Sequence, residues 1–203
     1  MISNKTINIC TTSRCLLRCP KCIRQTSPDY RTRGHDMPID VARKYAEYFE
    51  HILFCGQKSD PIYHEQFDEL VFAVKHRDVS IATNGTGKSL EWYENIQLIK
   101  PDITWIFGLD GLPEESHKYR IGQDGVQVFE AMKFLAKDPR TKVIWQYIPF
   151  NYNEDHIEEA KELAKQHNII FNLTISSRWD GPDDPYRPRN PELSFDRPKV
   201  HEQ

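Results

Sequence analysis

Short apolar runs alternate along the chain with segments whose apolar residues recur every three or four positions. The runs that are typical of buried strands stand at 7–10, 52–54, 79–83, 103–110, 142–150 and 169–175. The segments with a helical period or a helical start signal stand at 38–51, 67–74, 89–100, 126–136 and 153–167. We therefore predict six strands that are separated by five helices.

Residues at the starts of these segments support the helices. Pro38 suits the first turn of a helix, where its missing N–H is not needed. Asn153 is a natural N-cap, and acidic residues follow it in the first turn. One helix has an i, i+3, i+4, i+7 stripe formed by Phe67, Leu70, Val71 and Val74.

Strands that are nearly all apolar and alternate with helices predict an α/β fold with a parallel sheet. Six βα units predict a partial (β/α)6 TIM-like barrel, open on one side, with right-handed crossovers. The alternating aromatic residues of two strands should then be buried; they are Trp105, Phe107, Trp145 and Tyr147. We assign 1–180 to this core. Residues 181–203 contain five of the thirteen prolines and should form an irregular or disordered arm.

The composition and charge of the chain narrow the classes of partner that it could bind. The chain has 203 residues, 28% of them charged, and a net charge of -3, so there is no basic footprint for nucleic acid and no strongly acidic tail. No charged and apolar leader stands at the N-terminus, and no apolar run approaches the roughly 18 residues of a membrane span. We expect a cytoplasmic protein with no membrane partner.

Three of the five cysteines, Cys15, Cys19 and Cys22, lie within eight residues after the first predicted strand. An odd count at this spacing disfavours a secreted disulfide framework and favours reduced thiols that bind a metal. A structural zinc site needs four ligands, which a histidine such as His35 could complete. A cubane iron–sulfur cluster with three protein thiolates would keep one iron open. Cys10 and Cys55 are expected to be core residues.

The C-x3-C-x2-C spacing, placed after the first strand of a six-unit βα chain, resembles the radical S-adenosylmethionine (SAM) superfamily. The resemblance implies a [4Fe-4S] cluster on Cys15, Cys19 and Cys22, with SAM bound at the fourth iron. It also implies reductive cleavage of SAM to a 5′-deoxyadenosyl radical, and an external electron donor such as a flavodoxin or ferredoxin. In such enzymes the cofactors supply the difficult chemistry and the protein orients them.

Two further segments extend the resemblance. The stretch 54–64 resembles the family's Gly-Gly-Glu-Pro segment in a Gly-x-x-x-Asp-Pro form, which implies that the backbone around Gly56, Ser59 and Asp60 meets the methionine ammonium of SAM. Asn84 lies in an Ala-Thr-Asn-Gly-Thr sequence that resembles the family's strand-three ending.

The segment 107–122 resembles peptide-modifying members of the SPASM and Twitch type, which implies that Arg120 pairs with the SAM carboxylate. The segment 145–164 resembles the same subgroup and makes Gln146 and Asn151 candidates for lining the pocket. Asp110 either lines the cavity, with a possible part in proton transfer, or forms a turn with Gly111.

The sequence also departs from the family. Lys21 stands where an aromatic residue usually helps to hold the adenine, so only backbone contacts are expected there. Gly108 replaces a serine that usually touches the cofactor. No cysteine follows Cys55, which excludes an auxiliary cluster on ligand count.

These observations favour a radical SAM enzyme that abstracts hydrogen from a substrate. A peptide or protein side chain is the leading substrate class, and a small metabolite or nucleotide is next. Two alternatives stay open. One is a metal-binding or accessory protein that keeps the barrel without turnover. The other is a truncated relative that needs a partner chain to cover the open side of the sheet.

Overall fold

The computed structural model describes residues 5–27 and 35–195. Its strands form one six-stranded parallel sheet in which each strand pairs with the next along the chain. The strands are β1 Thr6–Ile9, β2 His51–Phe54, β3 Asp78–Thr83, β4 Thr104–Gly108, β5 Lys142–Tyr147 and β6 Ile170–Leu173. Because β1 and β6 are the two edges, the predicted partial barrel, open on one side, is confirmed.

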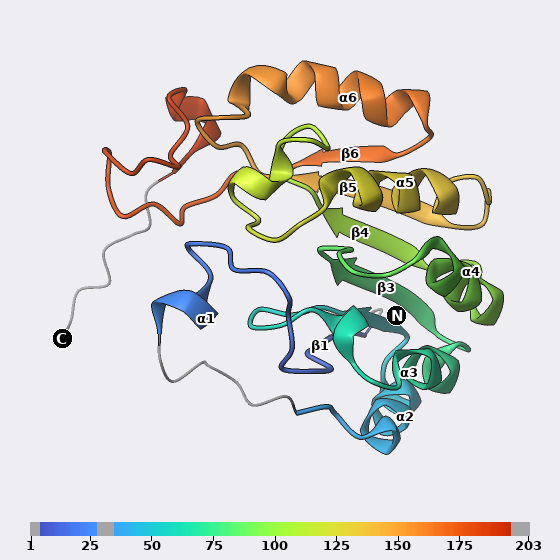
Figure 1. The fold of residues 1–203 in the computed structure, drawn as a ribbon. Coiled ribbons are helices and arrows are strands. Elements are labelled where there is room, and N and C mark those ends of the chain that lie inside the picture. The colour runs from blue at the N-terminus through green and yellow to red at the C-terminus, as the bar shows by residue number, and fades with distance from the viewer. Residues whose placement is uncertain (1–4, 28–34, 196–203) are drawn as a thin grey trace.

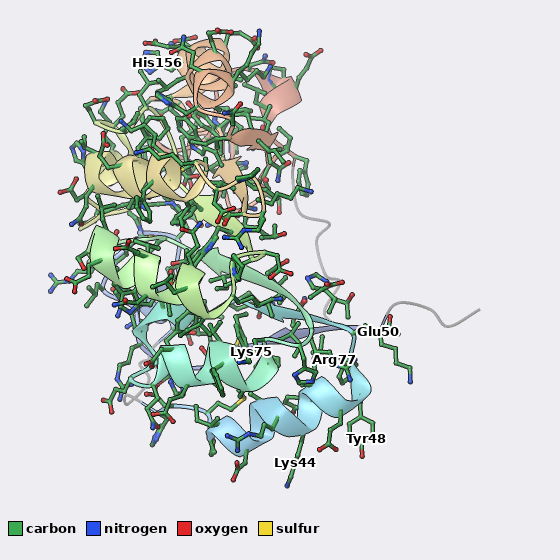
Figure 2. All side chains as sticks on the ribbon, turned by 90° about the vertical axis from the view of Figure 1, so that its right-hand side faces the viewer. Lys44, Tyr48, Glu50, Lys75, Arg77 and His156 are labelled. Atoms are coloured by element: carbon green, nitrogen blue, oxygen red, sulfur yellow. The ribbon has the colours of Figure 1, made fainter. Side chains whose placement is uncertain are left out.

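Helices cover one face of this sheet, and the cysteine loop lies at the carboxyl ends of the strands (Figure 1). The helices are α1 Ile23–Thr26, α2 Ile39–Tyr48, α3 Phe67–Val74, α4 Leu90–Ile99, α5 Gly125–Leu135 and α6 Ile157–Gln166. Lys44 and Tyr48 of α2 point away from the sheet (Figure 2). The short helix α1, directly after Cys22, was not predicted.

Side chains alternate between the two faces of the sheet, as strand geometry requires. Beneath the helices lie aromatic residues with no exposed surface, as predicted; they are Trp105, Phe107, Trp145 and Tyr147. On the opposite face, Ile106 and Ile144 are only half-buried. This face is the concave side of the partial barrel, and no helix of the described chain covers it (Figure 1).

The predicted N-cap at Asn153 is wrong for α6, which begins at Ile157. The Asn153 side chain is used in the preceding loop, where it accepts from Phe150 N at 2.6 Å and donates to Ile148 O at 3.1 Å. With its side chain engaged there, Asn153 precedes only a short 3-10 turn, Glu154–His156.

The described part of the arm, 181–195, contains one 3-10 turn, Pro191–Leu193, and an isolated parallel bridge from Ser194 to Ser176, and its other backbone is irregular. Aromatic contacts hold this segment on the core, because Tyr186 packs edge-on against Tyr119 with ring centroids 5.3 Å apart. The Asn151 N–H also donates to Tyr186 O at 3.3 Å. The boundary at residue 180 stays a prediction, and 196–203 lie outside the described residues.

Candidate metal and cofactor site

The three clustered cysteines lie on one loop between β1 and α1. The Cys22 N–H donates to Cys19 O at 3.0 Å, which bends the loop, and Cys22 then forms the N-cap of α1. Burial raises the pKa of Cys15 to about 11 and also raises the pKa of Cys19. A bound metal favours the thiolate over the thiol, so these thiols would ionise on binding one.

Among residues 5–27 and 35–195, no three His, Cys, Asp or Glu side chains converge as a metal-binding group. His35, the alternative fourth zinc ligand, is exposed and bonds to Ser13 through its backbone. The lack of convergence holds for Cys15, Cys19 and Cys22 too, so their fit to a metal group is judged by donor type and number, which are three thiols on one loop. This set suits a cluster that takes three protein thiolates, whereas a structural zinc site takes four ligands.

Asp60 and Asn84 form a buried network beside the cysteine loop. Asp60 accepts hydrogen bonds from Thr83 Oγ1 at 2.7 Å and from both Asn84 N and Asn84 Nδ2 at 2.5 Å. Asn84 Nδ2 also donates to Cys15 Sγ at 3.6 Å, and the Asp60 N–H donates to Arg14 O at 2.8 Å. The network thus connects the ends of β2 and β3 to the first cluster cysteine.

Two buried hydroxyls near this network have no hydrogen-bond partner in the described chain: Ser59 Oγ and Thr86 Oγ1. Buried polar atoms are normally paired, so an unpaired one calls for an explanation such as a missing ligand. Gly56 is also required to be small, because a Cβ there would overlap Ser59 O. The loops after β2 and β3 therefore carry unpaired polar atoms suited to a polar ligand.

Arg120 and Asp110 form a buried ion pair after β4. Arg120 Nε donates to Asp110 Oδ2 at 2.7 Å, and the Asp110 side chain has no exposed surface. Burial alone lowers the pKa of Arg120, but the charges of Asp110 and Cys19 and the hydrogen bond to Asp110 together outweigh this, so the pKa is raised. A Cβ at Gly108 would lie 2.5 Å from Arg120 Nη2. The guanidinium thus occupies the space that a serine side chain at 108 would need.

Lys21 binds the arm. Its ammonium forms ion pairs with Asp180 and, at 2.6 Å, with Asp184, whose side chain is fully buried. Burial lowers the pKa of Lys21, but hydrogen bonds to the two aspartates outweigh this effect and raise it. The Lys21 side chain therefore belongs to the arm contact, and its expected backbone contact to adenine stays a prediction.

Gln146 and Asn151 lie apart from the Asp60 network. Gln146 is paired with Gly108 in the β4–β5 register, and its Nε2 donates to Thr174 Oγ1 at 3.3 Å. Asn151 is exposed, and its backbone N–H bonds to Tyr186 of the arm. Their roles as pocket residues stay predictions.

Sequence reasoning missed Gln123, which connects two loops of the site. Its Nε2 donates to Asn84 O at 2.7 Å and to Gly108 O at 3.0 Å, and its side-chain oxygen accepts from Ser116 Oγ. Tyr63 was also missed; its hydroxyl bonds to Asn84 Oδ1 at 3.1 Å. Tyr63 stands two residues after the Asp-Pro pair, which was the available signal, whereas Gln123 has no motif.

Replacing Asp184 with alanine should loosen the arm. The change removes the buried acceptor of Lys21 and of the N–H groups of Asp180 and Tyr186. We expect trypsin to cleave after Arg178 and Arg189 several-fold faster than in the unmodified protein, because cleavage follows local opening. Asp183→Ala, at the exposed neighbouring position, is the control. Equal cleavage rates in both variants would contradict the inference that Asp184 holds the arm on the core.

Comparison with known proteins identifies the family. The family model described as the radical SAM superfamily matches residues 9–164. The chain therefore belongs to the radical SAM superfamily, which implies a [4Fe-4S] cluster and SAM as cofactors.

The described part of the chain contains no helix with the length and apolar character that a membrane crossing requires.

One curated relative is the tungsten-containing aldehyde ferredoxin oxidoreductase cofactor-modifying protein of Pyrococcus furiosus, 31% identical over 118 residues. The match covers 55% of this chain and 32% of the relative. Streptococcus suis SuiB bound to precursor peptide SuiA has a similar fold, with a TM-score of 0.67, 16% identity, and 83% and 38% of the two chains covered. For anSMEcpe with bound AdoMet and Cp18Cys peptide the TM-score is 0.65, the identity 17%, and the coverage 90% and 54%.

This chain thus spans about a third of the curated relative and about half or less of these two structures. The structural matches confirm the predicted fold.

Proposed function

We propose that this chain is the radical-generating core of an enzyme, with a [4Fe-4S] cluster on Cys15, Cys19 and Cys22. With SAM bound, this group supplies a 5′-deoxyadenosyl radical that abstracts hydrogen from a substrate. The observation that carries the proposal is the position of the three-thiol loop. It lies at the carboxyl ends of a partial barrel, beside buried polar groups that have no partner in the described chain. Active sites of βα barrels form at this end.

Each group around the loop has a role in this proposal. Ser59 and Thr86 would hydrogen-bond the polar part of SAM, because both hydroxyls are buried and unpaired in the described chain. Arg120 would bind the SAM carboxylate through Nη1 and Nη2, since its Nε is held by Asp110. Asn84 would position Cys15 through the hydrogen bond to its sulfur.

A peptide or protein side chain is the leading substrate class. The open side of the sheet leaves the concave face accessible to a large molecule, and two similar structures are of proteins bound to peptides. Those proteins are 16% and 17% identical to this chain and share its fold, so their substrates serve as the starting point for a search.

A cofactor of another enzyme is the second candidate. The P. furiosus relative is a cofactor-modifying protein, and its 31% identity exceeds that of the peptide-bound structures. Adding a cell extract before and after protease treatment would separate the classes, with 5′-deoxyadenosine as the readout. A stimulation that protease abolishes supports a peptide, and one that survives supports a cofactor or small metabolite.

The proposal is tested by anaerobic reconstitution. We expect about four irons per chain, an electron paramagnetic resonance signal that shifts when SAM is added, and slow formation of 5′-deoxyadenosine after reduction by a flavodoxin or by dithionite. The Cys15→Ala, Cys19→Ala, Cys22→Ala triple variant should retain no iron and form no product.

Stoichiometric zinc, or a cluster whose signal does not respond to SAM, would refute the proposed chemistry. A SAM-responsive cluster that yields no 5′-deoxyadenosine would instead favour the accessory-protein alternative.

A further inference from the structure

Two cysteines outside the cluster loop, Cys10 and Cys55, lie side by side at the ends of β1 and β2. The register pairs Ile9 with Phe54, and the Cys55 N–H donates to Ile9 O at 3.0 Å, so the ladder extends one position beyond the two strands. The next residues, Cys10 and Cys55, are therefore neighbours. Alpha carbons of adjacent strands lie about 4.8 Å apart, within the 4.4–6.8 Å span that a disulfide bridges.

Both thiols belong to the concave face. The side chains of Ile9 and Phe54 are buried beneath the helices, and successive residues of a strand point to opposite faces. The expectation that both cysteines are core residues is wrong, since Cys10 is exposed and Cys55 is only half-buried. Strand ends at the open face of the sheet, away from the covering helices, leave them accessible.

We propose that Cys10 and Cys55 form a redox-active dithiol that low-molecular-weight disulfides oxidise to an intramolecular disulfide. The exposed Cys10 thiolate attacks one sulfur of the small disulfide RSSR, which forms a mixed disulfide and releases one RS⁻. The Cys55 thiolate then attacks the Cys10 sulfur and releases the second RS⁻. One dithiol and one RSSR thus give one protein disulfide and two RSH, with both thiol protons on the released thiols.

The asymmetry of the pair assigns the two roles. Burial, with a further contribution from the nearby Cys10, raises the pKa of Cys55. A thiol of this kind is less often ionised and less accessible to a reagent, so it reacts best with a sulfur already held beside it. Cys10 is accordingly the attacking thiol and Cys55 the resolving one. The inference does not depend on the proposed SAM chemistry.

The test uses the full chain loaded with its cluster, oxidised glutathione as the probe, and tryptic mapping after alkylation. Cys10 falls in the peptide 6–14 and Cys55 in 45–58, while each cluster cysteine falls in a separate peptide. We expect 6–14 linked to 45–58. Two stable glutathione adducts, two unmodified thiols, or links from either peptide to the cluster loop would overturn the proposal.

The triple alanine variant separates this result from the fate of the cluster. Of the five cysteines it retains only Cys10 and Cys55, so oxidation should remove two hydrogen atoms and both free thiols. Cys55→Ser should trap one glutathione on Cys10, and Cys10→Ser should react about tenfold more slowly. Equal rates for the two single variants would refute the assigned roles.

Discussion

Replacing Asp110 with alanine is expected to lower the free energy of unfolding by about 3–5 kcal/mol. The Asp110 carboxylate is fully buried and accepts from Arg120 Nε at 2.7 Å and from Ile148 N at 3.0 Å. Alanine removes both acceptors and leaves a largely buried guanidinium without its counter-charge. Breaking one side of a buried ion pair is costly because the remaining charge keeps its desolvation penalty.

Urea unfolding of the reduced protein without cluster measures this change. The matched control is Asp40→Ala, which removes an exposed ion pair between Asp40 and Arg43. That pair should contribute under about 1 kcal/mol, since solvent screens it. If Asp110→Ala were no more destabilising than the control, the carboxylate would not be supporting Arg120 in the folded chain.

Replacing Asp60 with asparagine is expected to change the pH dependence of stability. Burial raises the pKa of Asp60 from 3.8 to about 6, against the opposing hydrogen bonds from Asn84 and Thr83. Between these values the folded chain keeps a proton that the unfolded chain has lost. Folding stability from this group therefore falls as pH rises from about 4 to about 6, and stays lower above that range.

Asparagine does not ionise, so the variant lacks this decline. At pH 4 the variant should be less stable than the unmodified protein. Its amide nitrogen faces hydrogen-bond donors of Thr83 and Asn84, which the carboxyl oxygens of Asp60 accept. The stability difference should shrink by about 3 kcal/mol by pH 7, which follows from the raised pKa of Asp60. Unfolding by urea from pH 4 to pH 7, with the exposed Asp68→Asn as control, measures it. Parallel curves for Asp60→Asn and the unmodified protein would contradict a raised pKa.

The strands were predictable because a parallel sheet covered by helices demands apolar side chains at nearly consecutive positions, as in β4 and β5. The cysteine loop was predictable because its ligands are local in sequence. The Asp60–Asn84 contact was not predicted, because 24 residues separate the two and the resemblance named each residue without relating them. No local pattern predicts that Asp184, within a proline-rich segment, binds Lys21, or that the Arg120 guanidinium fills the space beside Gly108.

The contact between Lys21 and the arm also constrains the order of assembly. Lys21 also binds Asp180, which lies directly before the arm and 159 residues from Lys21, so these contacts close most of the 203-residue chain into one loop. Contacts of such long sequence separation form late, because loop-closure entropy opposes them until other contacts have formed. During synthesis, residues 5–27 emerge long before residues 180–184. During this interval the cysteine loop therefore lacks its contact with the arm, and iron and sulfide can reach the loop before the arm packs on it.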